Sequence, residues 1–310
     1  MPYLRELPVF LKSVSASRYA IMNTMTLVLA HRSLSGLSVG DALGAQFFVP
    51  GTSVDELVQG RPPIGPWPWT DDTEMACNVV AELSERGTID QDALARAFSQ
   101  RYDPYRGYGP GTVVLLHQIR DGAPWLATSS AAFGGEGSRG NGAAMRVAPL
   151  GAYFAGEPVK AAREAALSAQ VTHFHQEGVC GAIAVAVASS IVGGEQTSDL
   201  IGDVLVHVPD GRVRDGLLRA RRLLGRSAEE VAYELGNGAQ VTAVDTVPFC
   251  LWVAATHLLD YRSAIVTCIQ SGGDIDTTAA IVGGIVGVVS EVPREWVKSR
   301  EPLPMWLETI

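Results

Sequence analysis

Two short acidic segments, about two hundred residues apart, carry the residue types in this chain that could do chemistry. The first reads Trp-Thr-Asp-Asp-Thr-Glu at residues 69–74, and the second reads Gly-Gly-Asp-Ile-Asp-Thr-Thr at residues 272–278. Each precedes a helical pattern, so its carboxylates and hydroxyls are expected in a first helical turn. Oxygen ligands of these kinds are the ones that hard divalent cations prefer. A pair of such ions can orient a substrate and activate water, which indicates metal-assisted hydrolysis.

Each segment also has an ordinary interpretation, because carboxylates at a helix N-terminus cap free N–H groups and complement the helix dipole. Two features favour a metal site instead. Each segment has two carboxylates where a cap needs one, and adjacent carboxylates repel unless a cation lies between them. If the two helix starts face each other, they form an all-oxygen cage that suits two Mg²⁺ or Mn²⁺ ions better than Zn²⁺. Its members are Thr70, Asp71, Asp72, Asp274, Asp276 and Thr277.

A glycine-rich segment is a candidate anion site. Residues 133–142 read Phe-Gly-Gly-Glu-Gly-Ser-Arg-Gly-Asn-Gly and run directly into Ala143, where a helix start is expected. Glycines let successive N–H groups turn inward around an anion, a helix start reinforces that preference, and Arg139 adds a planar cation for phosphate. A flexible surface loop is the alternative. The segment lacks the Gly-Lys-Ser/Thr ending of a P-loop, which argues against a Walker-type ATPase.

Composition predicts a compact protein with a large interior. Of the 310 residues, 47% are hydrophobic and 18% are charged. The net charge of −9 argues against broad nucleic-acid binding but leaves chemistry at a nucleic-acid end open. The four cysteines lie in apolar runs without a CxxC pair, which predicts buried reduced thiols and a cytoplasmic protein. No charge-free segment reaches the roughly 20 apolar residues of a membrane span, so no membrane association is expected.

Helical periodicity dominates and predicts an all-α, single-domain fold of more than ten helices. Apolar residues recur at helical spacing over 21–43, 75–83, 183–191, 247–258 and 281–289. Pro248 is expected in the first turn of its helix, where the missing N–H costs little. Residues 1–18 are expected to form an N-terminal extension, followed by a catalytic domain over 19–310.

Gly283, Gly284 and Gly287 leave two interpretations for the last of these segments. Glycines lower helix propensity, so a buried strand is one possibility. The i, i+4 spacing of the apolar residues favours the other, a helix packed closely against its neighbours through its glycines.

In chain order, these residues resemble the ADP-ribosylglycohydrolase family, which includes the dinitrogenase reductase-activating glycohydrolases. The likeness rests on an ordered set of short motifs, each unspecific alone, and it extends from about residue 33 over roughly nine tenths of the chain. The motifs are Gly-Asp-Ala-Leu-Gly at 40–44, Trp-Thr-Asp-Asp-Thr at 69–73, Gly-Asn-Gly-Ala-Ala-Met-Arg at 140–146, Thr-His at 172–173, Val-Pro at 247–248 and Gly-Gly-Asp-Ile-Asp-Thr at 272–277.

The resemblance implies an orthogonal helical bundle with a dinuclear Mg²⁺ centre at the base of a cleft. It implies hydrolysis at C1″ of ADP-ribose attached to a protein or nucleic acid, by a protein expected to be a monomer. The six cage residues would be the metal ligands, and Asp72 and Asp276 are the candidate bases for the attacking water. The implied ligand contacts are Phe133 on adenine, Gly137 and Ser138 on the diphosphate, His173 near the phosphates or distal ribose, and Gly109, Gly111, Arg139 and Asn141 along the same groove.

Two departures from the family pattern concern the leaving group. Phe48 stands where relatives acting on serine-linked ADP-ribose carry a Glu, unless Asp55 or Glu56 substitutes from further on. Arg139 follows the loop serine where an aromatic residue is common, although its guanidinium plane could stack on adenine. A catalytically silent ADP-ribose-binding protein is therefore the alternative function, and a hydrolase of another phosphate-containing nucleoside is a third.

Overall fold

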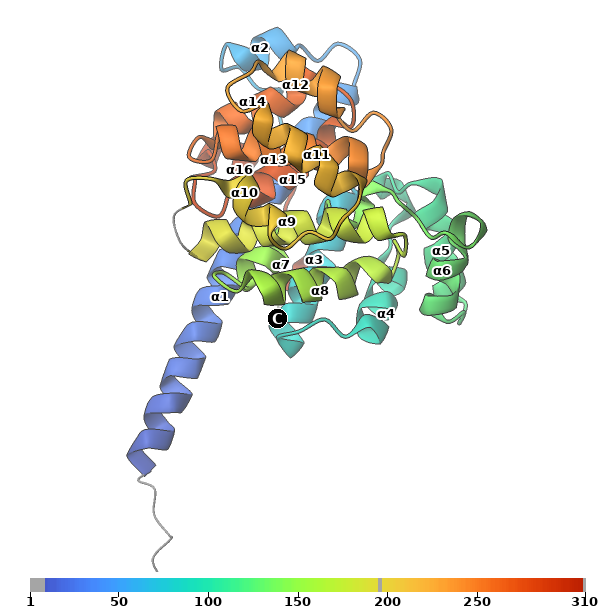
Figure 1. Ribbon diagram of the computed structural model, residues 1–310, viewed down its shortest axis with the longest axis vertical. Helices are drawn as coiled ribbons and strands as arrows, with labels where there is room; N and C mark the ends of the chain where they lie inside the picture. The colour runs from blue at the N-terminus through green and yellow to red at the C-terminus, as the bar shows by residue number, and fades with distance from the viewer. Residues whose placement is uncertain (1–8, 195–196, 309–310) are drawn as a thin grey trace, which may run out of the picture.

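The fold is known from a computed structural model that describes residues 9–194 and 197–308 (Figure 1). The described residues form seventeen α-helices, three short 3-10 helices and no strand, which confirms the predicted all-α fold. The α-helices are α1 (Val9–Ala45), α2 (Val54–Val58), α3 (Asp71–Arg86), α4 (Gln91–Arg101), α5 (Pro110–Arg120), α6 (Trp125–Gly135), α7 (Ala148–Tyr153), α8 (Pro158–Gln170), α9 (Gln176–Gly194), α10 (Leu200–Leu205), α11 (Arg212–Arg222), α12 (Ala228–Leu235), α13 (Ala243–Thr256), α14 (Tyr261–Ser271), α15 (Ile275–Val286), α16 (Arg294–Ser299) and α17 (Met305–Glu308). The 3-10 helices are η1 (Gln46–Phe48), η2 (Pro104–Arg106) and η3 (Asn141–Ala143).

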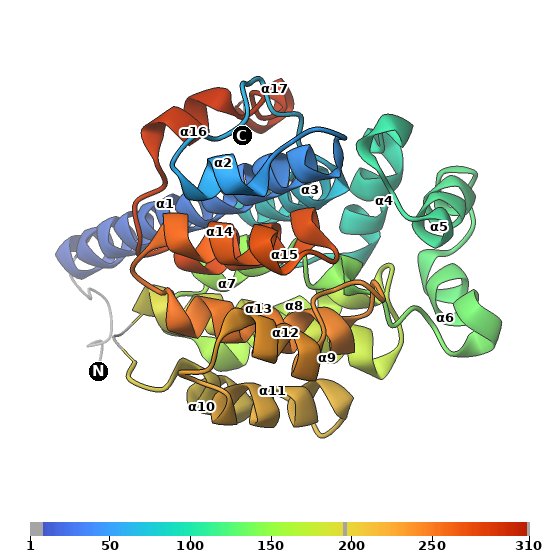
Figure 2. The same cartoon turned by 90° about the horizontal axis from the view of Figure 1, so that it is seen from above.

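Helices α1 and α15 lie side by side through a stripe of glycines, and this contact positions the acidic residues (Figure 2). Gly36, Gly40 and Gly44 recur every four residues on α1, so they share one face. A Cβ atom at Gly44 would lie 2.8 Å from the Cα atom of Asp276, and one at Gly40 would overlap the carbonyl oxygen of Ala279. The two backbones therefore approach as closely as only glycine allows.

The other side of this contact confirms the helical interpretation of the glycines near the end of α15. A Cβ atom at Gly283 would lie 2.5 Å from the carbonyl oxygen of Gly36. Two buried hydroxyls fix the pair, because Ser33 Oγ donates to the Gly284 carbonyl at 2.7 Å and Tyr261 Oη donates to the Gly36 carbonyl at 2.5 Å.

Helix α9 is the predicted central helix. It lies against α7, α8, α10 and α13, and residues on all of its sides are buried. By length and composition α9 could cross a membrane, and 78% of its apolar window is buried inside the protein. All four cysteines are buried and free, as predicted from their apolar surroundings.

The prediction for the start of the helix that contains Pro248 is wrong, and the prediction of an N-terminal extension stays open. Pro248 is the sixth residue of α13, not part of its first turn, because the helix begins at Ala243 with Thr242 as its N-cap. The proline ring packs on α11, where a Cβ atom at Gly216 would lie 2.5 Å from Pro248 Cγ.

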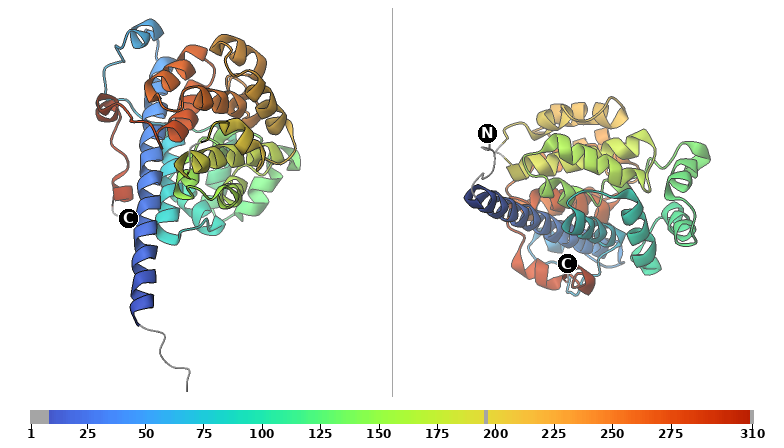
Figure 3. Two further views of the ribbon diagram at one scale, coloured as in Figure 1. Left: turned by 60° about the vertical axis from the view of Figure 1, so that its left-hand side comes forward. Right: turned by 90° about the horizontal axis from the view of Figure 1, so that it is seen from below.

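Residues 1–8 lie outside the described residues, and α1 runs unbroken past residue 18, its first turns projecting beyond the other helices (Figure 3). The predicted N-terminal extension therefore remains a prediction.

Candidate active site

The first acidic segment folds as predicted, with Thr70 as the N-cap of α3 and Asp71 and Asp72 in its first turn. A third carboxylate holds this helix start from outside. Asp41 of α1 is fully buried and accepts hydrogen bonds from the backbone N–H groups of Thr70 and Thr73, at 2.9 and 3.2 Å, and from both of their hydroxyls. Asp41 therefore supplies the cap that the Asp71–Asp72 pair would otherwise provide, which leaves that pair for another purpose.

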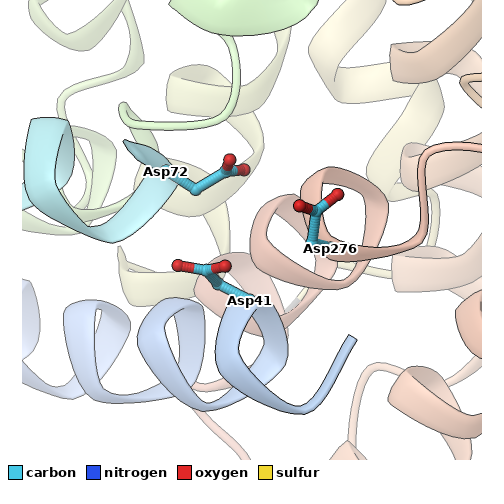
Figure 4. A group of neighbouring side chains, drawn as sticks. All are labelled: Asp41, Asp72 and Asp276. Atoms are coloured by element: carbon cyan, nitrogen blue, oxygen red, sulfur yellow. The ribbon is translucent and has the colours of Figure 1, made fainter. Parts of the chain in front are cut away.

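The second acidic segment meets the first across the end of α1. Asp274 is the N-cap of α15, and Asp276 and Thr277 lie in its first turn. One carboxylate oxygen from each of Asp41, Asp72 and Asp276 lies within 4.8 Å of the other two, and Figure 4 shows these side chains converging from α1, α3 and α15. Thr277 Oγ1 lies 3.5 Å from Asp72 Oδ2. The two helix starts thus face each other as the cage hypothesis requires.

The electrostatics of this cluster fit a divalent cation. Burial, together with the nearby Asp41 carboxylate, raises the pKa of Asp71 to about 8. Burial also raises the pKa values of Asp72 and Asp276 well above the ordinary range, again with Asp41 adding to the shift. No ion pair among the described residues joins these carboxylates to a Lys or Arg. Asp72 Oδ1 is buried without any hydrogen-bond partner, which suits a metal ligand.

The cluster forms one end of a cleft of about 740 Å³. That size is within the range of small-molecule sites. Its lining includes every predicted ligand contact, namely Gly109, Gly111, Phe133, Gly137, Ser138, Arg139, Asn141 and His173, together with the cage residues Asp71, Asp72, Asp274, Asp276 and Thr277. Thr70 lies behind this lining, held by Asp41.

An exposed aromatic ring stands on the cleft wall. Phe133 has a backbone φ of +54°, which is rare for a residue with a side chain, and its side chain is 68% exposed. A Cβ atom at Gly111 would lie 3.5 Å from the tip of the ring. A strained backbone that presents an apolar ring to solvent is typical of a ligand contact.

The glycine segment forms a wall of the cleft, and backbone hydrogen bonds hold its second half to the residues around the start of α13. The Arg139 carbonyl accepts from Ala243 N–H at 3.1 Å, and the Val241 carbonyl accepts from Asn141 N–H at 3.2 Å. Gly137 has φ +75°, and a Cβ atom there would lie 2.6 Å from the His175 nitrogen. The helix expected at Ala143 is only the three-residue η3, and α7 begins at Ala148, so no α-helix starts where the segment ends.

Asn141 acts on the acidic cluster. Its buried amide nitrogen donates to Asp274 Oδ2 at 2.7 Å and to Thr246 Oγ1 at 3.0 Å. Asn141 therefore fixes the orientation of one predicted metal ligand while lining the cleft, as residues behind metal ligands commonly do.

A buried hydrogen-bond chain orients His173. Arg146 is fully buried and donates to Thr172 Oγ1 at 2.9 Å, and Thr172 Oγ1 lies 2.8 Å from His173 Nδ1. Since the guanidinium only donates, the Thr172 hydroxyl is free to give its proton to Nδ1, which leaves Nε2 as the protonated nitrogen. Burial, together with the charge of Arg146, lowers the pKa of His173 to about 3. At neutral pH His173 thus offers the cleft an uncharged N–H donor.

Replacing the hydroxyl of Thr172 should weaken ligand binding without abolishing it. We expect Thr172→Val to lower ADP-ribose affinity about tenfold, because Arg146 loses an acceptor and His173 loses the donor that sets its tautomer. Calorimetry measures the affinity, and the ¹⁵N shifts of His173 report the tautomer. Thr172→Ser keeps the hydroxyl and should restore both. Unchanged ¹⁵N shifts in Thr172→Val would contradict the chain.

The loop before α5 is tied to the first acidic segment. Glu74 accepts from Tyr108 Oη at 2.6 Å and from Asp103 N–H at 3.1 Å. Arg106 stacks on Trp69, with its guanidinium carbon 3.3 Å from the ring centroid, and pairs with Glu301 through two hydrogen bonds of 2.8 and 3.0 Å. These contacts hold cleft-lining Gly107 and Gly109 next to the start of α3.

Phe48, Asp55 and Glu56, the residues on which the leaving-group prediction rests, all lie outside the lining of the cleft. Phe48 ends η1 and is 53% exposed. Asp55 and Glu56 lie in the first turn of α2, and neither lines the cleft. Glu56 is 3.8 Å from Arg61 in an exposed ion pair.

Sequence reasoning missed the role of Asp41. The Gly-Asp-Ala-Leu-Gly motif at 40–44 was recognised only as a family marker, although its glycines are the contact with α15 and its aspartate caps α3. The signal was available as glycines at i and i+4 around one acid in a helix, which indicates a close helix contact beside a buried carboxylate.

Comparison with known proteins agrees with this site. Residues 26–310 match the model of the ADP-ribosylglycohydrolase family. ADP-ribosylhydrolase ARH3 of Homo sapiens is 32% identical over an alignment of 323 positions, gaps included, that covers 86% of this chain and 88% of that protein. The uncharacterized protein YegU of Escherichia coli is 31% identical over 72% of each chain. A solved structure titled as an ADP-ribosylglycohydrolase-related protein complex shares the fold, with a TM-score of 0.58 at 23% identity over 90% of this chain and 94% of its own. This chain belongs to the ADP-ribosylglycohydrolase family and is an ADP-ribosyl glycohydrolase.

Proposed function

We propose that this protein is a Mg²⁺-dependent hydrolase that releases ADP-ribose from a modified protein or nucleic acid by cleaving the bond at C1″. The observation that carries the metal requirement is the buried cluster of carboxylates without a cationic partner, in which Asp72 Oδ1 has no hydrogen bond. The family relationship supports the hydrolase class, and the 740 Å³ cleft supports a ligand of nucleotide size.

Thr70, Asp71, Asp72, Asp274, Asp276 and Thr277 would hold two Mg²⁺ ions, with Mn²⁺ as an alternative. When bound, the ions would supply Lewis acidity and positive charge for the hydrolysis. Asp41 keeps Thr70 in place, and Asn141 keeps Asp274 in place, so the ligand set does not depend on the substrate for its order.

The protein residues bind and orient the substrate around this centre. The Phe133 ring is available to stack on adenine, and the Nε2–H of His173 is available to donate to a phosphate oxygen. A water attacks C1″ while the Asp72 or Asp276 carboxylate accepts its proton. The acceptor leaves with the electron pair of the broken bond. Solvent would protonate the leaving group.

The test is ADP-ribose release from arginine-, serine- and nucleic-acid-linked substrates, each in Mg²⁺ and in chelator. We expect release from at least one linkage in Mg²⁺, and its loss both in chelator and in Asp276→Asn. Release that persists in Asp276→Asn with intact folding would contradict the assignment. Tight ADP-ribose binding without release from any substrate would favour a silent binding protein, the alternative that Phe48 suggests.

Stability of the chelated protein should fall as pH rises. Burial raises the pKa of Asp71 to about 8 and that of Asp41 to about 6 in the metal-free protein, whereas an unfolded Asp titrates near 3.9. A raised folded pKa contributes stability below the unfolded pKa and loses it as pH rises towards the folded value. We therefore expect Tm in EDTA to decrease between pH 5 and pH 8, and Mg²⁺ to reverse much of the decrease. A flat or rising Tm in EDTA would contradict the raised pKa values of Asp41 and Asp71.

A further inference from the structure

A second, smaller hollow lies on α11 and the first turn of α13. Its volume is about 370 Å³, and it is lined by Arg212, Asp215, Leu218, Arg219, Arg222 and Val244. The charged residues follow one another at intervals of three and four along α11, so they share one face of the helix. Three guanidinium groups and one carboxylate give this arginine hollow a local charge of +2, in a chain whose net charge is −9.

The arginines of the hollow differ from their neighbours on the same helix. Arg214 pairs with Asp210 at 3.7 Å, and Arg221 pairs with Asp199. Within the described part of the chain, no ion pair or side-chain hydrogen bond engages Arg212, Arg219 or Arg222. A free guanidinium can give two parallel hydrogen bonds to one phosphate, and several around a hollow are typical of phosphate recognition.

The arginine hollow adjoins the cleft. Val244 is the second residue of α13, and the N-cap of that helix, Thr242, lines the cleft. At the other side, Arg212 N–H donates to Glu177 Oε1 at 2.7 Å, and Glu177 follows two residues after cleft-lining His175. Helix α11 lies against both α9 and α13, as Figure 2 shows. A bound polymer that extends out of the cleft past Thr242 or His175 therefore reaches these arginines next.

We propose that the arginine hollow is an accessory phosphate site. It holds the backbone of an ADP-ribosylated nucleic acid strand while the ADP-ribose of that strand occupies the cleft. This inference rests on the proposed function and identifies nucleic acid as the group to which the ADP-ribose is attached. The hollow has half the volume of the cleft, 370 against 740 Å³, so it suits a smaller group than ADP-ribose, such as one phosphate with its sugar. Arg212 and Arg222 are ten residues apart, about 15 Å along a helix, so a row of phosphates can engage them together. Leu218 and Val244 give an apolar surface for a sugar or base.

The test compares two double variants on the same helix. Arg219→Gln/Arg222→Gln changes the arginine hollow, and Arg214→Gln/Arg221→Gln makes the same charge change at paired arginines outside it. For an ADP-ribosylated single-stranded oligonucleotide, we expect the first pair to lower kcat/KM about tenfold by raising KM, with little change from the second. The slope of log affinity against log salt should fall by about 0.7 for each phosphate that the variant no longer binds. Turnover of an ADP-ribosylated neutral peptide should be unchanged in both.

Equal effects of the two double variants, or no effect on the oligonucleotide, would overturn the site. An equal loss for an ADP-ribosylated acidic peptide would show that the hollow docks protein, which also overturns the inference. Binding of an unmodified oligonucleotide in EDTA, followed by fluorescence anisotropy, requires no turnover and should weaken only in Arg219→Gln/Arg222→Gln. That result would support the site even if no substrate released ADP-ribose, so failure of the site and failure of the proposed function are distinguishable.

Discussion

Asp72→Asn is expected to lower ADP-ribose release about 10³-fold and, at the same time, to stabilise the metal-free protein. The first effect follows because Asp72 contributes both a candidate metal ligand and a candidate base. The second follows because burial and the carboxylates of Asp41, Asp276, Asp71 and Asp274 all oppose the charge of Asp72. Removing that charge should raise the free energy of unfolding in EDTA by about 1 kcal/mol or more, as one pKa unit corresponds to 1.36 kcal/mol.

Urea unfolding with and without Mg²⁺ measures the stability part of this prediction. Wild-type protein should gain stability when Mg²⁺ is added, and Asp72→Asn should gain much less, because its cluster has one carboxylate fewer. Asp121→Asn, at an exposed position after α5, is a matched control that should leave both activity and the Mg²⁺ effect unchanged. If Asp72→Asn were less stable than wild type in EDTA, the Asp72 carboxylate would stabilise the metal-free fold, which contradicts its assignment as a metal ligand.

Gly40→Ala is expected to destabilise the protein by about 3 kcal/mol and to reduce activity. The added Cβ atom would overlap the backbone carbonyl of Ala279, and backbone cannot move aside as a flexible side chain can. Helices α1 and α15 would have to separate. Because Asp41 follows directly on α1 and Asp276 begins the facing helix, the separation would also pull the acidic cluster apart.

Thermal and urea unfolding give the stability change, and ADP-ribose release gives the loss of function. Gly109→Ala is the stability control, since Gly109 has an ordinary φ of −60° and no atom lies within 4 Å of a Cβ built there. That variant should change stability by no more than about 0.5 kcal/mol. Equal stability of the two variants would mean that the α1–α15 contact is looser than the structure shows.

The sequence predicted the parts of this fold that depend on local pattern. Helices around Met75, Ile183 and Ile281 follow from apolar periodicity, and Thr70 follows from the capping preference of Thr before two acids. The close-packed helix containing Gly283 could be predicted because glycines at helical spacing remain compatible with a helix when a neighbour lies against them.

Long-range contacts explain what the sequence left open. Nothing local to Asp41 shows that it will cap α3, about thirty residues later, because that depends on how α1 packs against α3. The glycine segment similarly owes its order to Val241 and Ala243, about one hundred residues further on. Its expected helix at Ala143 was wrong because Asn141 is drawn towards Asp274 and Thr246, and the chain makes a 3-10 turn there.

The most direct test of the metal-dependent hydrolysis is a Mg²⁺ titration of chelated wild-type protein with a substrate that it turns over. ADP-ribose release should be absent in EDTA, return along a saturable curve with added Mg²⁺, and stay about 10³-fold below wild type at every Mg²⁺ concentration in Asp72→Asn. Equal release by wild-type protein in EDTA and in Mg²⁺ would contradict the assignment of the Asp72–Asp276 cluster as a metal centre.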